Sequence, residues 1–181
     1  MATTYSTHAK ARPSYATARR NYAVYVSTYA KYNAGAPAGA WLNLDDYADR
    51  DEFIEAARDL HANESDPEFM YQDWEGLPSA LVSESTIEDE VWDYIAHGAE
   101  EGAKRAFIDI TGYWDTDEFD SRYQGEWDSK RDFAEQLAED LGYLDNIPEH
   151  LQGYFDYDAF ARDLFLDGYT FENGSVFAEA R

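Results

Sequence analysis

The chain has 181 residues, and its 38 Asp and Glu residues outnumber its 14 Lys and Arg residues to give a formal net charge of −24. This charge repels DNA, RNA and anionic membrane surfaces as direct ligands, and no sequence window approaches the roughly 18 apolar residues of a membrane span. The absence of cysteine excludes disulfides, a thiolate nucleophile and cysteine zinc sites. Because 44% of the residues are hydrophobic and 17% are aromatic, we expect a folded chain with its charge on the surface.

The charge is divided unevenly along the chain. Residues 1–44 contain no acidic residue, so residues 45–181 hold all 38 acids beside nine bases, a net charge of −29. Residues 1–21 are basic, rich in Ala, Thr and Ser, and lack hydrophobic periodicity. This composition predicts a disordered basic extension ahead of the folded body.

Residues 22–81 are predicted to form an N-terminal α+β domain. Residues 22–29 are rich in β-branched and aromatic residues and predict a strand, and residues 40–44 are expected to form the returning strand after a turn that contains Gly and Pro. Apolar residues at helical spacing predict a helix over 45–61. A third strand is expected over 69–74.

Residues 82–124 are predicted to form a central helical domain. Ser85 and Glu88 have the spacing of a capping box, which predicts a helix that begins there and runs to about Phe107. Residues 111–126 are aromatic and acidic without clear periodicity, and we expect a loop or a short helix there.

Residues 125–181 are predicted to form a C-terminal α+β domain. Asp128 or Ser129 can cap a helix with a regular apolar face, and Gly142 stands where a helix C-terminus favours glycine. Asn173-Gly174 suits the left-handed positions of a hairpin turn between two short strands. Two further helices are expected, over residues 148–151 and 158–165.

The predicted fold class is therefore α+β, as an elongated chain of small domains. An N-terminal sheet with a helix is followed by a helical middle part and by C-terminal helices with a small antiparallel sheet.

The many carboxylates do not match a known metal motif. Asp115-x-Asp117 begins like a calcium-binding loop, but Phe119 stands where the next oxygen ligand belongs. Asp156-x-Asp158 fails in the same way. We therefore expect neither a metal site nor a cofactor.

Enzymatic motifs are also missing from the sequence. The histidines are scattered, and the chain has no nucleophile elbow, phosphate-binding loop or dinucleotide fingerprint. A pair of carboxylates can still serve a hydrolase such as a glycosidase, and sequence spacing does not reveal such a pair among 38 acids. A carboxylate-dependent hydrolase stays open as the alternative to a non-enzymatic role.

An acidic surface has positive support in the helix expected near residue 128. Asp128, Asp132, Glu135 and Glu139 recur at spacings of four, three and four, which places them on one ridge. B-DNA carries one negative charge per about 1.7 Å, so the net charge of the chain equals that of about 40 Å of duplex. These features suggest a DNA mimic whose carboxylates stand for phosphates. A salt-adapted scaffold or adaptor, with few lysines and many acids, explains the composition equally well.

Several sequence blocks resemble ArdA-type antirestriction proteins. These blocks are residues 25–35 (YVSTYAKYNAG) with the Gly39–Trp41 segment, residues 66–76 (DPEFMYQDWEG) and residues 155–167 (FDYDAFARDLFLD). The similarity extends in order over residues 22–178, so several blocks agree in register.

The resemblance implies an elongated homodimer of three small domains that imitates bent duplex DNA. Such a protein occupies the DNA site of type I restriction–modification enzymes, is carried by mobile genetic elements and acts in the cytoplasm. It implies no catalysis, no direct contact with nucleic acid and no membrane. The antirestriction segment and the dimer contact fall in the C-terminal domain.

The expected target-binding surface consists of acidic residues from three parts of the chain. They are Asp51, Glu55, Asp59, Asp115, Asp117, Glu118, Asp120, Asp128, Asp132, Glu135, Glu139 and Asp140.

Among the remaining prominent residues, the aromatic ones are expected in the core. This expectation applies to Trp41, Phe155, Tyr157 and Phe160. Arg162, which lies between acids, is expected to form a structural ion pair.

Overall fold

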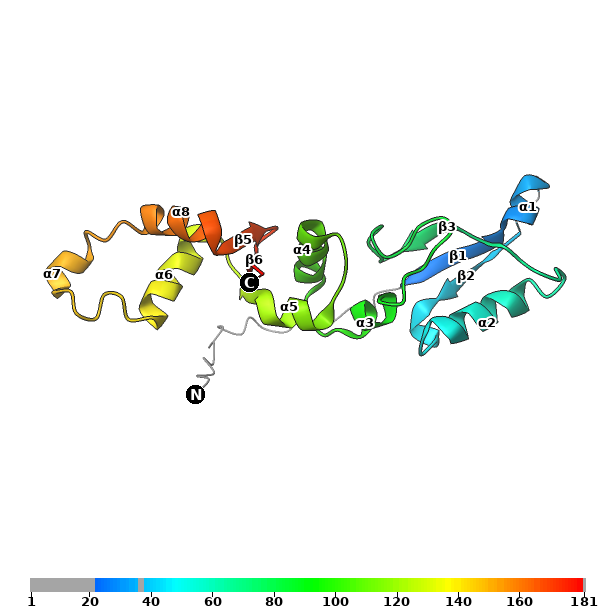
Figure 1. The fold of residues 1–181 in the computed structure, drawn as a ribbon, viewed down its shortest axis with the longest axis horizontal. Helices are drawn as coiled ribbons and strands as arrows, with labels where there is room; N and C mark the ends of the chain where they lie inside the picture. The colour runs from blue at the N-terminus through cyan, green and yellow to red at the C-terminus, as the bar shows by residue number, and fades with distance from the viewer. Residues whose placement is uncertain (1–21, 36–37, 181) are drawn as a thin grey trace.

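The computed structural model describes residues 22–35 and 38–180, and the expected basic extension at residues 1–21 lies outside these ranges. The described chain is an elongated α+β body in which a three-stranded sheet with helix α2 occupies one end and helices α6 to α8 occupy the other (Figure 1). The predicted α+β class is confirmed. Within the described residues, no helix combines the length and apolar character that a membrane span requires.

The first sheet is antiparallel, with strand order β2-β1-β3. Strand β1 (Ala23–Thr28) lies in the middle, and its Val24 and Val26 are fully buried. Strands β2 (Ala40–Asn43) and β3 (Phe69–Glu75) pair with its two edges. The structure thus confirms all three strands predicted for this part of the chain.

The helical predictions around this sheet need correction at their ends. A short helix that the sequence analysis did not anticipate, α1 (Tyr29–Asn33), follows β1 directly. The segment after β2 is a 3-10 turn, η1 (Leu44–Asp46), and α2 (Arg50–Leu60) begins only after Asp49, whose side chain accepts a hydrogen bond from the Glu52 amide. The acids before Asp49 therefore belong to the turn.

The capping box predicted at Ser85 is wrong. Val82 and Ile87, both almost fully buried, form an isolated antiparallel bridge, and the Thr86 amide donates to Ser83 Oγ in the turn between them. Burial of these two apolar residues in an extended pair replaces the expected first turn of a helix.

The long helix predicted for the middle part is in fact two helices. They are α3 (Val91–Ala96) and α4 (Glu101–Thr111), and the break follows His97. The His97 ring packs against Trp114 and Phe119, at centroid distances of 5.3 and 5.0 Å. The Ala99 amide donates to His97 Nδ1, so the turn is held by the same side chain.

The second sheet brings the end of the chain back to the middle. Helix α5 (Thr116–Arg122) leads into strand β4 (Tyr123–Glu126), which pairs with β6 (Ser175–Ala178). Strand β5 (Tyr169–Glu172) forms the other neighbour of β6. Asn173 and Gly174 have φ values of 48° and 85°, which confirms the predicted hairpin turn.

Three helices lie between β4 and β5. Helix α6 (Lys130–Asp140) is capped by Ser129 and followed by Gly142 at φ 65°, as predicted. Helix α7 (Glu149–Gln152) follows Pro148, and α8 (Tyr157–Asp167) packs against α6. Phe133 of α6 contacts Phe165 of α8 and Tyr169 of β5. These rings give this part of the chain an aromatic core of its own.

A single buried cluster extends from the first sheet to the second. It includes Val24 of β1, Phe53 of α2, Phe107 of α4 and Phe177 of β6, all fully buried. The expectation that Trp41 belongs to this core is wrong, because Trp41 is 44% exposed and contacts Tyr25 at the outside of β1. Three other aromatic residues expected in the core, Phe155, Tyr157 and Phe160, are only partly buried.

A buried charged cluster joins the first sheet to the central helices. The Lys104 side chain is 2% exposed, and its Nζ lies 3.3 Å from Glu101 Oε2 and donates to the Tyr94 carbonyl at 2.8 Å. The hydroxyls of Tyr22, just before β1, and of Tyr94 in α3 both donate to the Glu101 carboxylate. Burial opposes ionisation of Glu101, but the Tyr94 hydrogen bond and the Lys104 charge outweigh it and lower the carboxyl pKa.

We expect Lys104→Met to lower the free energy of unfolding by about 3 kcal/mol, because it leaves a buried carboxylate without its cation. Lys130→Met makes the same chemical change at an exposed position, where the ammonium group lies 5.1 Å from the centre of the Phe165 ring, and should cost less than about 1 kcal/mol. Urea denaturation of both variants measures the difference. Adding Glu101→Leu to Lys104→Met should recover part of the loss, and a Lys104→Met protein as stable as the parent would contradict the role assigned to this cluster.

Candidate acidic interaction surface

Helix α2 presents its acids on the face opposite its core residues. Asp51, Glu55 and Asp59 follow one another at intervals of four and are all exposed, whereas Phe53 and Ala57 are fully buried. This arrangement follows from the amphipathic pattern, since residues four apart share a helix face.

The acids of α5 divide into two pairs with different surroundings. Asp115 caps the helix by accepting a hydrogen bond from the Glu118 amide at 2.7 Å, and Asp117 is exposed in the first turn. Glu118 forms an ion pair with the buried Arg122 at 2.6 Å, and Asp120 lies 3.1 Å from His97 Nε2. In the second pair Asp120 is exposed and Glu118 is partly buried, and each also contacts a side chain of the fold.

Tyr113 and Glu118 perturb each other. The Tyr113 hydroxyl donates to Glu118 Oε2 at 2.5 Å. This hydrogen bond, followed by the nearby Arg122 charge, lowers the pKa of Glu118, and the same bond raises the pKa of Tyr113. Glu118 is therefore held as an anion.

Three of the four residues predicted to form a ridge, Asp132, Glu135 and Glu139, lie on α6, whereas Asp128 precedes the Ser129 cap and is not part of the helix. Asp132 exchanges two hydrogen bonds with Ser129, since its amide donates to Ser129 Oγ and its carboxylate accepts from the hydroxyl. Glu135 is half-buried and pairs with Arg131 at 2.7 Å, and Arg131 also reaches Asp158. Asp128, Asp132, Glu139 and Asp140 are exposed.

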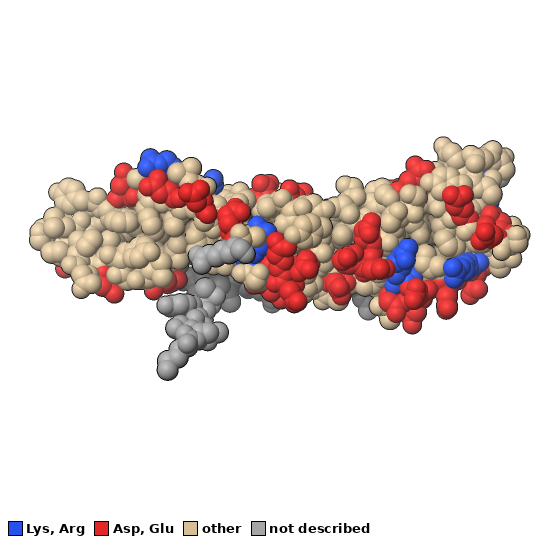
Figure 2. All heavy atoms as spheres, viewed as in Figure 1, with Lys and Arg blue, Asp and Glu red and all other residues tan. Residues whose placement is uncertain are grey.

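The structure does not bring the twelve predicted acids together in one cleft. They lie on α2, on α5 and on α6, three separate parts of the elongated body. On the face shown in Figure 2, acidic side chains gather over α2 and over the segment from α3 to α5, with few basic ones between them. Within the described residues, no group of three or more His, Cys, Asp or Glu side chains is arranged to hold a metal ion.

Both Asp-x-Asp motifs that resemble calcium loops turn out to cap helices. Asp115 caps α5, and Asp156 caps α8 by accepting a hydrogen bond from the Ala159 amide. The first aspartate of each motif thus stabilises the N-terminus of a helix.

Residues 24–177 match the family model of the antirestriction protein ArdA. The chain belongs to the ArdA antirestriction family. This membership agrees with the resemblance in the sequence blocks, and the matched range includes every helix that the structure describes and both sheets apart from one terminal residue of β1 and one of β6. No curated protein sequence gives a significant match to the chain.

Membership of the ArdA family makes this chain an antirestriction protein whose partners are restriction–modification enzymes. ArdA is a family of inhibitor proteins and not a known enzyme family. The exposed acids of this chain are therefore candidates for contacts with another protein.

Two acidic residues on the surface of the middle part are absent from the predicted surface. Glu88 and Glu90 are exposed beside Tyr113 and Trp114. They escaped notice because the mistaken capping box assigned Glu88 to a helix N-terminus. The signal that remains in the sequence is a run of three acids, residues 88–90, between the buried Ile87 and Val91.

Two acids at opposite ends of α6 allow the ridge charge to be tested through stability. Glu139 lies in the last turn, four residues from Glu135, so Glu139→Gln relieves like-charge repulsion and an unfavourable contact with the negative end of the helix dipole. Asp132→Asn removes a favourable charge from the first turn.

We expect Glu139→Gln to raise the free energy of unfolding by about 0.5 kcal/mol and Asp132→Asn to lower it by a similar amount. Unfolding in urea at low salt is the appropriate measurement, because guanidinium chloride screens charge. Shifts of the same sign in both variants would contradict this assignment.

Proposed function

We propose that this ArdA protein is a DNA mimic that occupies the DNA-binding site of type I restriction–modification enzymes and inhibits both cleavage and modification. The observation that carries the proposal is the placement of exposed carboxylates along an elongated body. Ten of the twelve predicted acids are exposed, and they lie on helices near both ends and in the middle. Residues that contact phosphates in such an enzyme would meet negative charge along the whole length of the inhibitor.

The amount of charge supports the same proposal. The net charge of −24 equals the charge on about 40 Å of B-DNA, at one charge per about 1.7 Å. Binding would release counterions from the acidic surface, so inhibition should weaken as salt rises. A target that normally binds DNA along its length explains why exposed acids are found on α2, α5 and α6 together.

The hydrolase alternative has less support. Glycosidase chemistry needs one carboxyl group held protonated beside a second carboxylate in a cleft. The pKa shifts found for Glu64, Glu101 and Glu118 are all downward. Each of these groups is stabilised as an anion by hydroxyl or basic neighbours. A salt-adapted adaptor would share the charge but would not inhibit a restriction enzyme.

Homodimer formation through residues 125–181 is part of the proposal. These residues carry large apolar side chains on the surface, with exposed fractions of 84% for Tyr154 and 70% for Leu166. Burying them against a second copy would remove apolar area from water and double the length of the acidic surface. We also retain residues 22–81, 82–124 and 125–181 as the proposed domains.

The decisive experiment is a titration of the purified protein into a type I restriction enzyme, with DNA cleavage and methylation measured at low and raised salt. We expect inhibition of both activities near stoichiometric amounts, weakening as salt increases. Absence of inhibition in excess, or inhibition that does not respond to salt, would exclude the mimic. Hydrolytic activity that disappears with one carboxylate would instead favour the enzyme.

Charge reversal on α6 tests where the target binds. Asp132→Lys with Glu139→Lys should weaken inhibition about tenfold, because exposed charge contacts contribute up to about 1 kcal/mol each. The matched control is Asp66→Lys with Glu68→Lys, two exposed acids outside the predicted surface. Equal losses in both double variants would show that net charge matters and position does not.

Disrupting the proposed dimer should have a larger effect than reversing two charges. Tyr154→Asp with Leu166→Asp places charge on the exposed apolar surface, and we expect a monomer that retains little inhibition. Light scattering reports the oligomeric state, and Tyr32→Asp, at an exposed aromatic residue in α1 outside the proposed dimer contact, is the control. A monomeric variant with full inhibition would refute the need for a dimer.

A further inference from the structure

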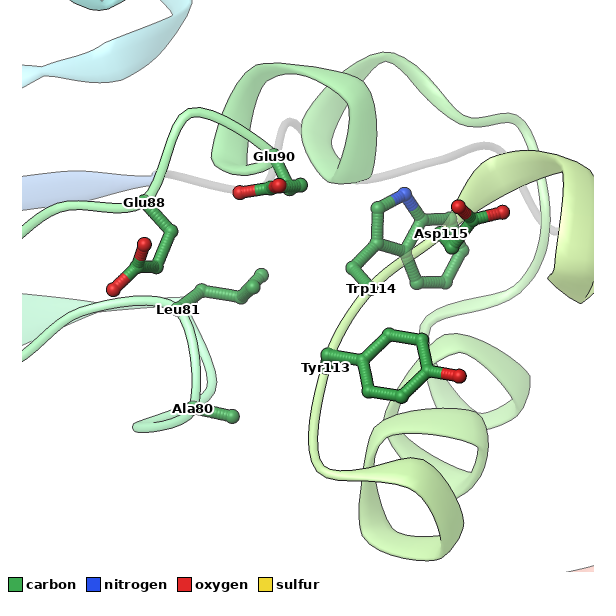
Figure 3. A pocket seen from close by; sticks show the side chains of 7 residues that line it. All are labelled: Ala80, Leu81, Glu88, Glu90, Tyr113, Trp114 and Asp115. Carbon is green, nitrogen blue, oxygen red and sulfur yellow. The ribbon is translucent and has the colours of Figure 1, made fainter.

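A hollow of about 340 Å³ lies in the middle of the molecule, between the segment before α3 and the segment before α5. Leu81 and Ala80 form one side, and the rings of Tyr113 and Trp114 form the other (Figure 3). Glu88 and Glu90 lie on the side of the segment before α3, and their carboxylates point away from the two rings (Figure 3). The hollow is at the small end of ligand sites, so it suits a single side chain better than a large ligand.

Tyr113 is an exposed aromatic ring that is already fixed in place. It is 48% exposed, yet its hydroxyl is bound to Glu118, which is itself paired with Arg122. The ring also contacts Phe107 in an edge-on arrangement with centroids 6.4 Å apart. A ligand that packs on this ring would not need to order it first, which lowers the entropic cost of binding.

The carboxylates of Glu88 and Glu90 are available to a ligand. Both residues are exposed, and among the residues that the structure describes neither carboxylate forms a salt bridge. Their backbone is nevertheless fixed, since the Glu88 amide donates to the Leu81 carbonyl at 3.0 Å and Glu90 caps α3. Asp115, the third acid at the hollow, uses one oxygen to cap α5.

The lining selects a planar cation. Three carboxylates repel an anion, and the described residues offer no cluster suited to a metal ion. Aromatic faces attract a cation, and a guanidinium group stacks on such a face while its N–H groups donate to carboxylates in a fork. An ammonium group offers a compact, strongly hydrated charge without a planar face.

We propose that this hollow binds the guanidinium group of an arginine side chain presented by a partner protein. The guanidinium group lies against Tyr113, and the exposed side chains of Glu88 and Glu90 turn toward it to accept its hydrogen bonds. The identity of the partner as a restriction–modification enzyme that inserts a DNA-contacting arginine rests on the proposed function, whereas the selectivity of the hollow does not.

An arginine site adds a contact that a phosphate backbone does not offer. Proteins contact DNA phosphates largely through arginine and lysine, so an enzyme's DNA site presents the required cation. Stacking on a fixed ring in a hollow is less exposed to solvent than a pair of surface charges and is therefore less screened by salt. The hollow thus retains part of the affinity at salt concentrations that weaken the acidic surface.

The selectivity of the hollow can be measured without any partner enzyme. Nα-acetyl-argininamide and Nα-acetyl-lysinamide are titrated separately into the full chain, and the indole N–H signal of Trp114 is followed by NMR. We expect the arginine probe to shift this signal with a dissociation constant in the millimolar range, and the lysine probe to bind about tenfold more weakly. Equal shifts from both probes, or none from the arginine probe, would overturn the proposal.

Tyr113→Leu tests the aromatic wall, because it removes the ring and leaves the net charge unchanged, although it also removes the hydrogen bond to Glu118. It should weaken binding of the arginine probe about tenfold and weaken inhibition of a type I enzyme by a similar factor at raised salt. Tyr32→Leu, at a residue of similar exposure (52%), is the control and should change neither. Full inhibition by Tyr113→Leu at raised salt would overturn the arginine contact with the enzyme.

The carboxylates are tested by Glu88→Gln with Glu90→Gln, against Asp66→Asn with Glu68→Gln as the control for lost charge. We expect only the first pair to weaken the arginine probe. If the probe binds as expected while the parent protein fails to inhibit any type I enzyme, the proposed function fails and the guanidinium site stands. If the protein inhibits but the probe does not bind, the guanidinium site is refuted and the proposed function stands.

Discussion

The buried pairing of Glu101 with Lys104 is the interaction on which the placement of the other acids depends. The carboxylate of Glu101 gathers hydroxyls from Tyr22, before the first sheet, and Tyr94, in the central helices, while Lys104 closes the cluster from α4. Arg105 adds a link from α4 to the Gly76 carbonyl, just after β3. Two parts of the chain that are distant in sequence are thus fixed to each other, and with them the acids of α2 and α5.

Basic residues in this chain are few, and most of those described are committed to local contacts. Arg122 pairs with Glu118, Arg131 with Glu135 and Asp158, and Arg162 with Asp163, which confirms the ion pair expected for Arg162. The acids neutralised in this way lie in the first turn of a helix (Glu118, Asp158), four residues along the same helix (Glu135) or next in sequence (Asp163). The remaining acids repel one another, and an elongated body separates like charges more than a sphere of equal volume does. The elongated shape on which the proposal of DNA mimicry rests thus also lessens self-repulsion.

Elements determined by nearby residues were predictable from the sequence, and elements determined by distant contacts were not. The Asn173-Gly174 turn and the Ser129 cap depend on backbone preferences within a few residues, and both predictions are confirmed. The capping box at Ser85 failed because burial of Ile87 against Val82 determines that segment. The break after His97 likewise depends on rings that lie some twenty residues further along the chain.

The candidate site shows the same division. Composition and helical spacing identify exposed acids on α2 and α6, since one amphipathic pattern defines both the buried and the charged face. The hollow beside Tyr113 joins two segments about 25 residues apart, and only folding brings Glu88 near that ring. Long-range charge mainly raises the rate of encounter, whereas contacts in a fixed pocket mainly slow dissociation. A protein that imitates DNA by charge alone would compete with DNA on equal terms, so a short-range contact that DNA lacks is what would allow the inhibitor to remain bound.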